Sequence, residues 1–347
     1  MEKSPLISVI MSAYNEEAFV ERAIKSILGQ TEQSFEIIIF DDCSTDTTMD
    51  IIERIRDERI RFYKNSENCG LTSNLNKGLR LAKGRYIARM DGDDISLPER
   101  FEKQVRYFEE HPDVMLISCQ TQNFGESSLC WKLKESSEEL KARMLVRPVF
   151  AHPGFMMRRE LLDRGFFYDE TFRTAQDYEL ASRIAGEYQV GIVREILLYY
   201  RVHKKQVSNL SGKEQFHNAD RVREKLWNQV GVALSEDEKR ALQKWAKEER
   251  AESVTEYVEI NRLIDKILAA NKTSHIYQQE VLNRTLNRLL YLWVIRSKKP
   301  GYLLAFPKVC RYRGKNMVLF VRELLETMKE KIKNSGGNRQ TGTPSGG

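Results

Sequence analysis

The chain has 347 residues, of which 41% are hydrophobic and 31% are charged, and its formal net charge is +6. These values predict a soluble globular protein, built as one large domain with an appendage or as two domains. The longest apolar cluster, residues 289–295, is far shorter than the roughly 20 apolar residues of a membrane-spanning helix, so we expect no transmembrane segment.

The N-terminus and the cysteines indicate a cytosolic protein. Residues 1–5 show no secretory signal and lead directly into a predicted strand. The five cysteines are odd in number and have no paired spacing. This pattern predicts free thiols in a reducing compartment and no zinc site.

Strand and helix patterns alternate over residues 1–120. Short apolar runs predict strands at residues 6–11, 35–40, 60–64, 85–90 and 114–119. This alternation predicts an α/β fold in which a mostly parallel sheet is flanked by helices. Because ligands bind at the carboxyl ends of the strands in such sheets, the loops 12–16, 41–46 and 91–94 should meet at one edge.

Three carboxylates, Asp91, Asp93 and Asp94, lie around Gly92 directly after the fourth predicted strand. Like charges so close together repel one another, so a cation should bind there. A hard divalent ion, held by one or two carboxylates and by substrate phosphates, fits this pattern. A solvated acidic turn is the alternative for this stretch taken alone. Asp94 is also a candidate cap for the helix that begins near Pro98.

After residue 123 the alternation weakens, and beyond about residue 211 the strand signals end. Helices are predicted at residues 137–146 and 176–185, and strands at residues 155–158 and 190–199. Further helices are predicted at about residues 214–230, 235–249, 254–270, 278–295 and 316–333. Ser235 and Glu238 have the spacing of a capping box.

Several common enzyme signatures are missing from the sequence. No Gly-x-Gly-x-x-Gly follows the first strand, which argues against a dinucleotide-binding dehydrogenase. The chain also has no P-loop, no His-Glu-x-x-His and no Gly-x-Ser-x-Gly. What remains is a nucleotide-sized site at the sheet edge that is built from carboxylates.

Nine separated segments of the chain occur in a characteristic order and spacing. They are residues 9–16, 23–31, 35–46, 65–70, 76–78, 84–98, 151–153, 176–180 and 200–203. Together, over about residues 5–208, they resemble the family 2 glycosyltransferases. The resemblance implies a nucleotide-sugar-binding α/β fold of the A type. It also implies inverting transfer of a sugar from a nucleoside diphosphate donor.

The resemblance assigns two residues to the nucleotide base. Tyr14 would line the uracil pocket, where its ring can stack on the base; the alternative is a rim tyrosine. Asp42 would accept a hydrogen bond from the uracil imide. Asp41 is expected to stabilise the turn, although either carboxylate could hold the base. Cys43 stands where family members often have glycine, so the turn must form without the freedom of glycine.

The resemblance also assigns residues to the diphosphate. Asp93 is predicted to bind Mg²⁺ or Mn²⁺, and Asp91 to contact the ribose or a metal-bound water. A metal is expected because the leaving diphosphate gains negative charge as the glycosidic bond forms. His203 is predicted to complete the metal site, with a structural hydrogen-bonding role as its alternative, and Arg201 to pair with phosphate.

Asp177 is the predicted catalytic base. It would take the proton of the acceptor hydroxyl while that oxygen attacks the anomeric carbon from the face opposite the diphosphate. Most family members that this chain resembles carry Glu at the position of Gln176, so a neighbouring charge is missing here. A helix N-cap role for Asp177 is compatible with catalysis. For His152 we expect a structural or acceptor-lining role.

Basic and aromatic residues interleave between residues 291 and 315. This pattern suits a segment that lies on an anionic bilayer, and the alternative is an amphipathic core region whose charges face water. No nucleic-acid recognition fold is recognisable, so we expect no nucleic-acid partner. We expect a cytoplasmic protein that is peripheral at the inner face of the plasma membrane.

The predicted organisation follows from the resemblance and from the change in composition. A catalytic domain occupies residues 1–210, with a nucleotide-binding half at about 1–120 and an acceptor half at about 121–210. A helical extension follows at residues 211–333, and residues 334–347 are expected to be disordered.

The predicted function is transfer of a sugar from a UDP-sugar donor to a saccharide or lipid-linked oligosaccharide acceptor, in the synthesis of surface polysaccharide. A catalytically silent nucleotide-sugar-binding or scaffold protein is the alternative, raised by Gln176 and Cys43. The presence of both Asp93 and Asp177 argues against it. A nucleotidyltransferase would carry a Gly-rich basic loop after its first strand, and residues 12–17 contain neither feature.

Overall fold

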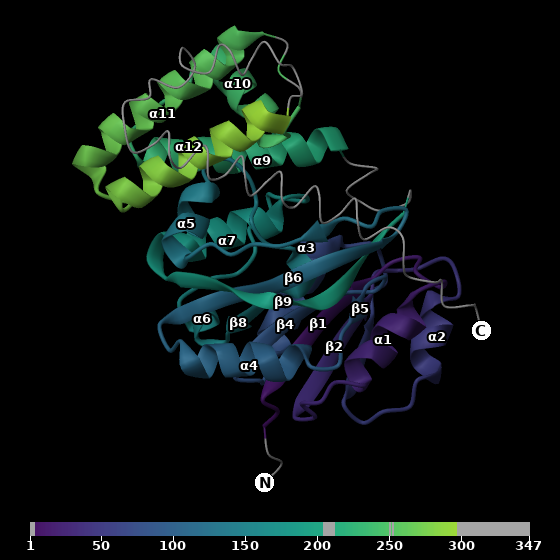
Figure 1. Ribbon diagram of the computed structural model, residues 1–347. Helices are drawn as coiled ribbons and strands as arrows, with labels where there is room; N and C mark the ends of the chain where they lie inside the picture. Colours follow the sequence, from purple (N-terminus) through teal and green to yellow (C-terminus); the bar gives the residue numbers. More distant parts are fainter. Residues whose placement is uncertain (1–3, 204–211, 250, 252, 297–347) are drawn as a thin grey trace, which may run out of the picture. The chain divides into compact units, whose positions relative to one another are not determined.

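A computed structural model of the chain describes residues 4–203, 212–249, 251 and 253–296 (Figure 1). The chain groups into two units, Met1–Leu226 and Trp227–Gly347. The division falls inside helix α9 (Gly212–Gln229), later than the predicted domain boundary near residue 210, which stays a prediction.

The first unit contains the strands and most of the helices. Its strands are β1 (Ile7–Ala13), β2 (Phe35–Asp41), β3 (Ile60–Lys64), β4 (Tyr86–Asp91), β5 (Ile95–Ser96), β6 (Val114–Gly125), β7 (Cys130–Trp131), β8 (Met156–Arg158) and β9 (Gln189–Val202). Its helices before α9 are α1 (Val20–Leu28), α2 (Thr48–Arg54), α3 (Leu71–Leu81), α4 (Arg100–Glu110), α5 (Ser137–Arg143), the 3₁₀ turn η1 (His152–Gly154), α6 (Glu160–Asp163) and α7 (Gln176–Glu187).

Nine strands within the described residues form one sheet in the order β3-β2-β1-β4-β8-β6-β9-β5, with β7 paired to β6. The long pairings are parallel: β1 with β2 and β4, β2 with β3, and β6 with β9. The four antiparallel pairings are short. The predicted α/β fold with a mostly parallel sheet is therefore confirmed, and β8 lies between β4 and β6 in the sheet.

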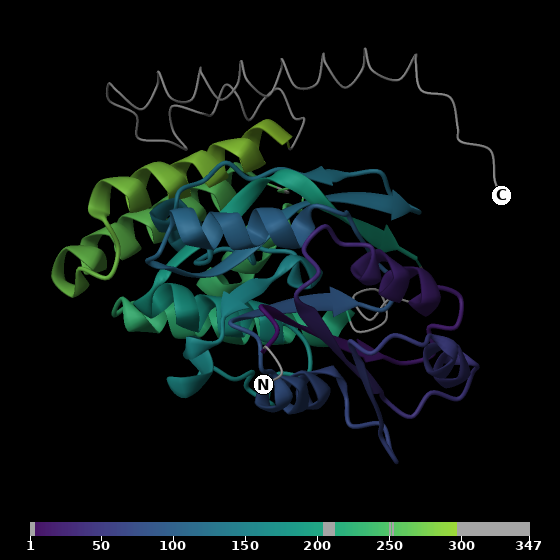
Figure 2. The same cartoon turned by 90° about the horizontal axis from the view of Figure 1, so that it is seen from below.

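Helices cover both faces of the sheet. Alternate side chains of the central strands, including Val9 and Met11, form one buried cluster with α1 and α4. On the opposite face α3 packs closely on β1, because a Cβ atom at Gly78 would lie 2.5 Å from Ile10 Cγ2. Figure 2 shows α4 and α3 on opposite sides of the strands. Burial of each large aliphatic side chain contributes about 1.5–3 kcal/mol, so the strands give the loops at their ends a rigid base.

The carboxyl ends of three parallel strands meet at one edge, as predicted. Ala13 at the end of β1 is in register with Asp41 at the end of β2. On the other side of β1, Ser12 is in register with Asp91 at the end of β4. The loops after β1, β2 and β4 therefore emerge side by side.

The described part of the second unit is helical. It contains α10 (Glu236–Ala246), α11 (Val254–Ser274) and α12 (Gln279–Arg296), and α11 and α12 lie side by side (Figure 1). Ser235 Oγ accepts from the Glu238 N–H and the Glu238 carboxylate accepts from the Ser235 N–H, which confirms the capping box. The buried rings of Tyr257 and Trp293 meet edge to face, with centroids 4.6 Å apart.

Some predictions concern residues that the structure does not describe. The helix at 316–333, the tail at 334–347 and nearly all of the basic and aromatic segment lie outside the described residues. In the part of the chain that is described, no helix has the length and hydropathy of a membrane span.

Candidate active site

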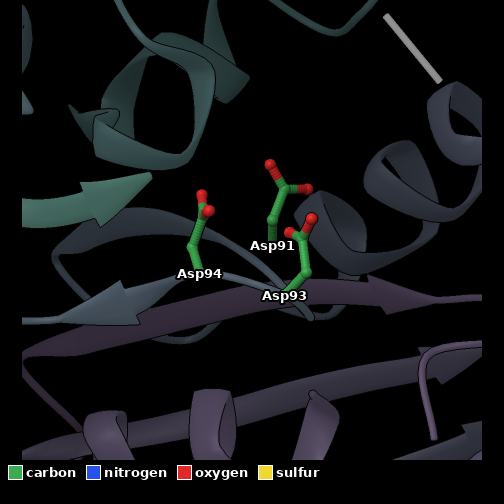
Figure 3. A group of neighbouring side chains, drawn as sticks. All are labelled: Asp91, Asp93 and Asp94. Atoms are coloured by element: carbon green, nitrogen blue, oxygen red, sulfur yellow. The ribbon is translucent and has the colours of Figure 1, made fainter. Parts of the chain in front are cut away.

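Three carboxylates gather where β4 ends. Asp91 is the last residue of β4, and Asp93 and Asp94 stand in the turn before β5. One carboxylate oxygen from each residue lies within 4.8 Å of the others, and the three carboxyl groups point to the same side of the strands (Figure 3). Asp94 is fully buried and Asp93 is 8% exposed, whereas the Asp91 side chain is 27% exposed. We call these residues the acidic cluster.

The negative charge of the acidic cluster is only partly compensated by the positive charges around it. Burial, and then repulsion from Asp91, raise the pKa of Asp93 and raise that of Asp94 further. Asp94 Oδ2 is buried and has no hydrogen-bond partner among the described residues. An acidic, oxygen-rich and under-compensated site is the donor set that Mg²⁺ or Mn²⁺ prefers, so these residues fit a divalent cation.

A fourth carboxylate faces the cluster from the loop after β1. Glu16 Oε2 is buried and has no partner within the described residues. It lies against Gly92, where an added Cβ atom would overlap it. Burial, followed by repulsion from Asp93 and Asp91, raises the pKa of Glu16 well above its ordinary value. Glu16 is not among the site residues predicted from the sequence, although its loop was predicted to reach this edge.

The end of β9 is tied to the acidic cluster. The Arg201 N–H donates to Asp94 Oδ1 at 2.7 Å, and Arg201 Nε donates to the Asp93 carbonyl at 2.7 Å. The Arg201 guanidinium lies over the rings of Phe19 and Phe124, 4.2 and 4.3 Å from their centroids. Arg201 thus reaches the predicted site, where the contacts it makes are with the protein itself.

Asp94 does not cap the helix after it, so that expectation was wrong. Helix α4 has Glu99 at its N-cap, with no side-chain capping bond, and the Asp94 carboxylate accepts from the Arg201 backbone instead. Local spacing pointed to the cap, but the partner is 107 residues away in the sequence.

His203 lies beside Asp93, and the structure brings together the two residues predicted to share a metal. His203 Nε2 is 3.0 Å from Asp93 Oδ2, and the imidazole packs against Phe19 with ring centroids 5.3 Å apart. The contact joins β9 to the turn after β4. It is compatible with a shared metal and also with a purely structural hydrogen bond.

The end of β2 forms a second part of the edge, where the buried carboxylate accepts several hydrogen bonds from the protein. The Asp42 carboxylate accepts from the N–H groups of Cys69 and Gly70 at 2.8 and 2.9 Å, and from Asn65 Nδ2 at 2.8 Å. It therefore holds the polar loop 65–70 against the sheet. An ionised carboxylate has about four acceptor positions, so Asp42 Oδ2 retains one.

The residues around Asp42 shape this part of the edge. Asp41 Oδ2 accepts from the Ser44 N–H at 3.1 Å, as expected of a turn residue. Cys43 follows with φ +62°, so the turn requires a left-handed residue and forms without glycine, at a cost of about 1 kcal/mol or more. The Tyr14 side chain is 48% exposed at the end of β1, which leaves a ring face available to a base.

Asp177 lies in the first turn of α7, within the predicted acceptor half. The N-cap of this helix is Ala175, with φ +56°, so Asp177 is the second helical residue and not the cap. Burial raises the pKa of Asp177, while the Tyr178 N–H and the charge of Arg89 oppose that rise. The side chain is half-buried, which suits a group that must meet a substrate. Beside it, Gln176 Oε1 is buried without a hydrogen-bond partner in the described part of the chain.

Two further residues, Lys77 and His152, have local partners. Lys77 Nζ donates to Asn65 Oδ1 at 3.2 Å and so supports the loop that Asp42 holds. His152 is buried, with Nε2 2.8 Å from the Tyr168 hydroxyl. Burial, and then the charge of Arg89, lower the pKa of His152 well below its ordinary value, so the imidazole is neutral. This contact agrees with the structural one of the two roles expected for His152, and the acceptor-lining role stays a prediction.

Sequence reasoning missed Arg89. Its guanidinium forms an ion pair with Asp91 from within β4, and the residue is only 4% exposed. A charged residue inside an otherwise apolar strand was the available signal.

Known proteins are similar to this chain in sequence and in fold. Residues 8–166 match the family model described as Glycosyl transferase family 2. An uncharacterized glycosyltransferase of Methanocaldococcus jannaschii is 36% identical over 207 residues, which are 57% of this chain and 71% of that protein. The Escherichia coli UDP-Glc:alpha-D-GlcNAc-diphosphoundecaprenol beta-1,3-glucosyltransferase WfaP is 42% identical over 104 residues, 30% of this chain and 41% of that protein.

The fold also matches a solved structure. The crystal structure of S. aureus TarS 1–349 in complex with UDP-GlcNAc aligns with a TM-score of 0.56 and 18% sequence identity. The alignment covers 88% of this chain and 93% of that one. At this identity the likeness concerns the fold.

Proposed function

Because this chain belongs to the family 2 glycosyltransferases, we propose that it transfers a sugar from a UDP-sugar to a hydroxyl of a saccharide or lipid-linked acceptor, with inversion at the anomeric carbon. Membership of the family makes it a glycosyltransferase, and one relative, ExoO of Rhizobium meliloti, is named as a succinoglycan biosynthesis protein. The donor, the acceptor and the stereochemistry are the proposal.

The observation that carries the proposal is the acidic cluster, with Asp177 on the neighbouring acceptor half. Asp93 and His203 would hold a divalent cation, with Asp91 toward the ribose or a metal-bound water. When bound, the cation neutralises charge on the leaving diphosphate. Buried carboxylates that lack a partner support this assignment, because a cation would relieve both their repulsion and their desolvation.

The nucleotide base is bound at the end of β2. Tyr14 stacks on the uracil ring, and the acceptor position left on Asp42 Oδ2 receives the imide N–H. Three hydrogen bonds from the loop 65–70 hold this carboxylate still, so it is oriented before the nucleotide arrives. The Arg201 guanidinium, held between Phe19 and Phe124, is within the same edge and pairs with phosphate.

Asp177 is the general base. It accepts the proton of the attacking hydroxyl, and a single displacement then inverts the anomeric centre without a sugar–enzyme intermediate. A pKa raised above the ordinary aspartate value makes Asp177 a better proton acceptor, provided that the group stays ionised at the working pH. The start of a helix, where the positive end of the helix dipole lies, helps to keep it ionised.

The acceptor is the least specified partner. WfaP is named for glucosyl transfer to GlcNAc-diphosphoundecaprenol, which supports a lipid-linked saccharide as the acceptor here. Such an acceptor would bring the enzyme to the inner face of the plasma membrane, where the basic and aromatic segment at 291–315 could contact anionic lipid.

The decisive experiment replaces Asp177 by Asn. Removal of a general base lowers transfer by about 10²–10⁴-fold, whereas binding of UDP with Mn²⁺ should remain nearly intact. A screen of UDP-sugars, followed by product release assays, measures the first quantity and calorimetry measures the second. Asp163→Asn, at an exposed carboxylate in α6, is the matched control and should behave as wild type.

Either of two results would count against this proposal. If Asp177→Asn abolishes UDP binding, Asp177 belongs to the donor site and another group is the base. If the wild type binds UDP with Mn²⁺ but turns over no UDP-sugar with any saccharide acceptor, the silent nucleotide-sugar-binding protein is the better description.

A further inference from the structure

Residues 168–174 lead directly into the helix that carries Asp177. They are tightly packed, and Phe172 is fully buried while Thr174 is 7% exposed. Ala175 follows as the N-cap of α7, with φ +56°, and Asp177 is the second residue of the helix. The position of the proposed base therefore depends on the contacts that fix residues 168–174.

Helix α3 binds this segment through the side chain of Asn76. Asn76 Nδ2 donates to the Tyr168 carbonyl at 3.0 Å, and Asn76 Oδ1 accepts from the Tyr168 N–H at 3.0 Å. The same Nδ2 group donates to Glu170 Oε1 at 2.9 Å. Asn76 is 2% exposed, so its amide uses both donors and an acceptor position inside the protein. Loss of this side chain would leave the main chain of Tyr168 without these two partners.

Thr72, one turn earlier in α3, binds the same segment. Its hydroxyl donates to the Phe172 carbonyl at 2.9 Å, and the residue is buried. Residues 72 and 76 are four apart, so they lie on one face of the helix. Buried polar side chains are unfavourable unless they are hydrogen-bonded. On this face of α3 their partners are main-chain groups 92 and 100 residues away in the sequence.

Helix α9 contacts the segment as well. Asn218 Nδ2 donates to Thr174 Oγ1 at 2.9 Å, and both residues are buried. Arg221 Nη1 donates to the Thr171 carbonyl at 3.2 Å. Both α9 residues belong to the first unit of the chain. Residues 168–174 are therefore fixed by side chains from two helices.

The first turn of α3 belongs to the site proposed for the nucleotide base. Gly70 is the N-cap of α3, and its N–H donates to Asp42 Oδ2 at 2.9 Å. Further along the helix, Asn74 Oδ1 accepts from Asn65 Nδ2 at 2.7 Å, and that Asn65 group also donates to Asp42 Oδ1. One helix thus contacts both the Asp42 site and the segment that precedes Asp177.

We propose that Asn76 and Thr72 are positioning residues for the base. They fix residues 168–174 and so set the position of Asp177 with respect to the donor site that the same helix helps to build. The role in transfer rests on the proposed function, whereas the contact of α3 with the segment does not. A base must lie within about 2.6–3.2 Å of its proton donor, and a displacement of about 1 Å can slow a reaction by roughly a hundredfold.

The test compares two asparagines that make the same set of hydrogen bonds. Asn271, in α11, donates through Nδ2 to the Tyr277 carbonyl and to Gln279 Oε1, and its Oδ1 accepts from the Tyr277 N–H. It is 1% exposed, so Asn76→Ala and Asn271→Ala should lower the melting temperature by similar amounts. We expect only Asn76→Ala to slow sugar transfer in a single turnover, by roughly tenfold to a hundredfold. Calorimetry should show an affinity for UDP with Mn²⁺ close to wild type in both variants.

A second pair of variants separates the hydroxyl of Thr72 from its volume. Thr72→Val keeps the shape of the side chain and removes the donor to the Phe172 carbonyl, whereas Thr72→Ser keeps that donor. We expect Thr72→Val to slow transfer and Thr72→Ser to stay close to wild type. If Asn76→Ala does not fold, this pair tests the proposal.

Hydrogen exchange tests the contact of α3 with the segment without an assay of transfer. The Tyr168 amide should exchange faster in Asn76→Ala than in the wild type, and no faster in Asn271→Ala.

Three results would overturn the proposal. They are equal transfer rates in Asn76→Ala and Asn271→Ala, a loss of UDP affinity as large as the loss of rate, and transfer as slow in Thr72→Ser as in Thr72→Val. Failure of the proposed function looks different, because the wild type then transfers no sugar. Hydrogen exchange decides in that case, and an unchanged rate at Tyr168 in Asn76→Ala would show that α3 does not fix the segment.

Discussion

Two groups of carboxylates stand at the same edge of the sheet, and they are built in opposite ways. Asp42 is almost fully buried, and its carboxylate accepts three hydrogen bonds from the loop 65–70. Asp93 and Asp94 are buried as well, but Asp94 Oδ2 has no described partner and the pKa values of both are raised. At the first site the protein supplies the hydrogen bonds that the buried carboxylate requires. At the second site the negative charge of the carboxylates is only partly compensated.

The difference supports the ligand proposed for each site. A carboxylate that is already held by N–H donors can recognise a neutral ligand through its remaining acceptor position. Carboxylates that repel one another favour a bound cation, because its charge relieves the repulsion. A divalent ion can do this and can bind the diphosphate as well. The comparison predicts that mutations at the two sites change stability with opposite signs.

The largest expected effect is the loss of metal-dependent binding in Asp93→Asn. Loss even of an outer-shell partner of a metal ligand costs about 10–100-fold in affinity, so loss of a ligand should weaken binding of UDP with Mn²⁺ by roughly a hundredfold or more. Calorimetry measures the affinity, and EDTA should bring the wild type to the level of the variant. Asp113→Asn, at an exposed carboxylate before β6, serves as control. If the wild type keeps its affinity for UDP in EDTA, binding does not depend on a metal ion.

The next effect is a loss of stability in Asp42→Asn. Three donors lose a charged acceptor, and an Asn side chain offers one oxygen in place of two, so the free energy of unfolding should fall by about 1–3 kcal/mol. Urea unfolding of the metal-free protein measures it. An unchanged midpoint would show that the loop 65–70 does not depend on this carboxylate.

The third effect has the opposite sign and should be smaller. In metal-free protein at pH 7 to 8, Asp93→Asn should raise the melting temperature, because the folded state no longer carries an ionised group whose pKa is raised. The penalty is fully present above the raised folded pKa and disappears as the pH falls through it toward the ordinary value of 3.8. The gain should therefore fade on acidification. A destabilised variant at pH 8 would contradict the charge imbalance.

The smallest effect concerns the contacts of the Arg201 side chain with Phe19, Phe124 and the Asp93 carbonyl. In Arg201→Ala the two ring contacts and the hydrogen bond to the Asp93 carbonyl are lost. The loss should cost about 1–2 kcal/mol of stability, because each ring contact at a partly exposed site contributes roughly 0.5–1 kcal/mol. Thermal unfolding measures this loss against Arg194→Ala, whose side chain donates to the Lys134 carbonyl in an exposed position. Equal losses of stability in the two variants would mean that the Arg201 contacts stabilise the fold no more than an exposed arginine does.

The sequence by itself determined the fold class and the sheet edge at which the candidate site lies. Helical and strand periodicities are local properties, and parallel strands bring their carboxyl ends to one edge, so the loops after β1, β2 and β4 could be placed together. The capping box at Ser235 is equally local and was predicted from its spacing. Asp93 and His203 were paired by family resemblance, and they lie 3.0 Å apart.

Only the tertiary structure decided which partner each carboxylate has. Asp94 was expected to cap the nearby helix, yet it binds the Arg201 backbone, and Asp42 binds a loop that begins 23 residues later. The main chain of Arg89 contacts Phe155 and Arg100, which its own strand does not reveal. Hydrogen bonds and burial depend on which segments pack together after long loops close, and local spacing carries no record of that packing.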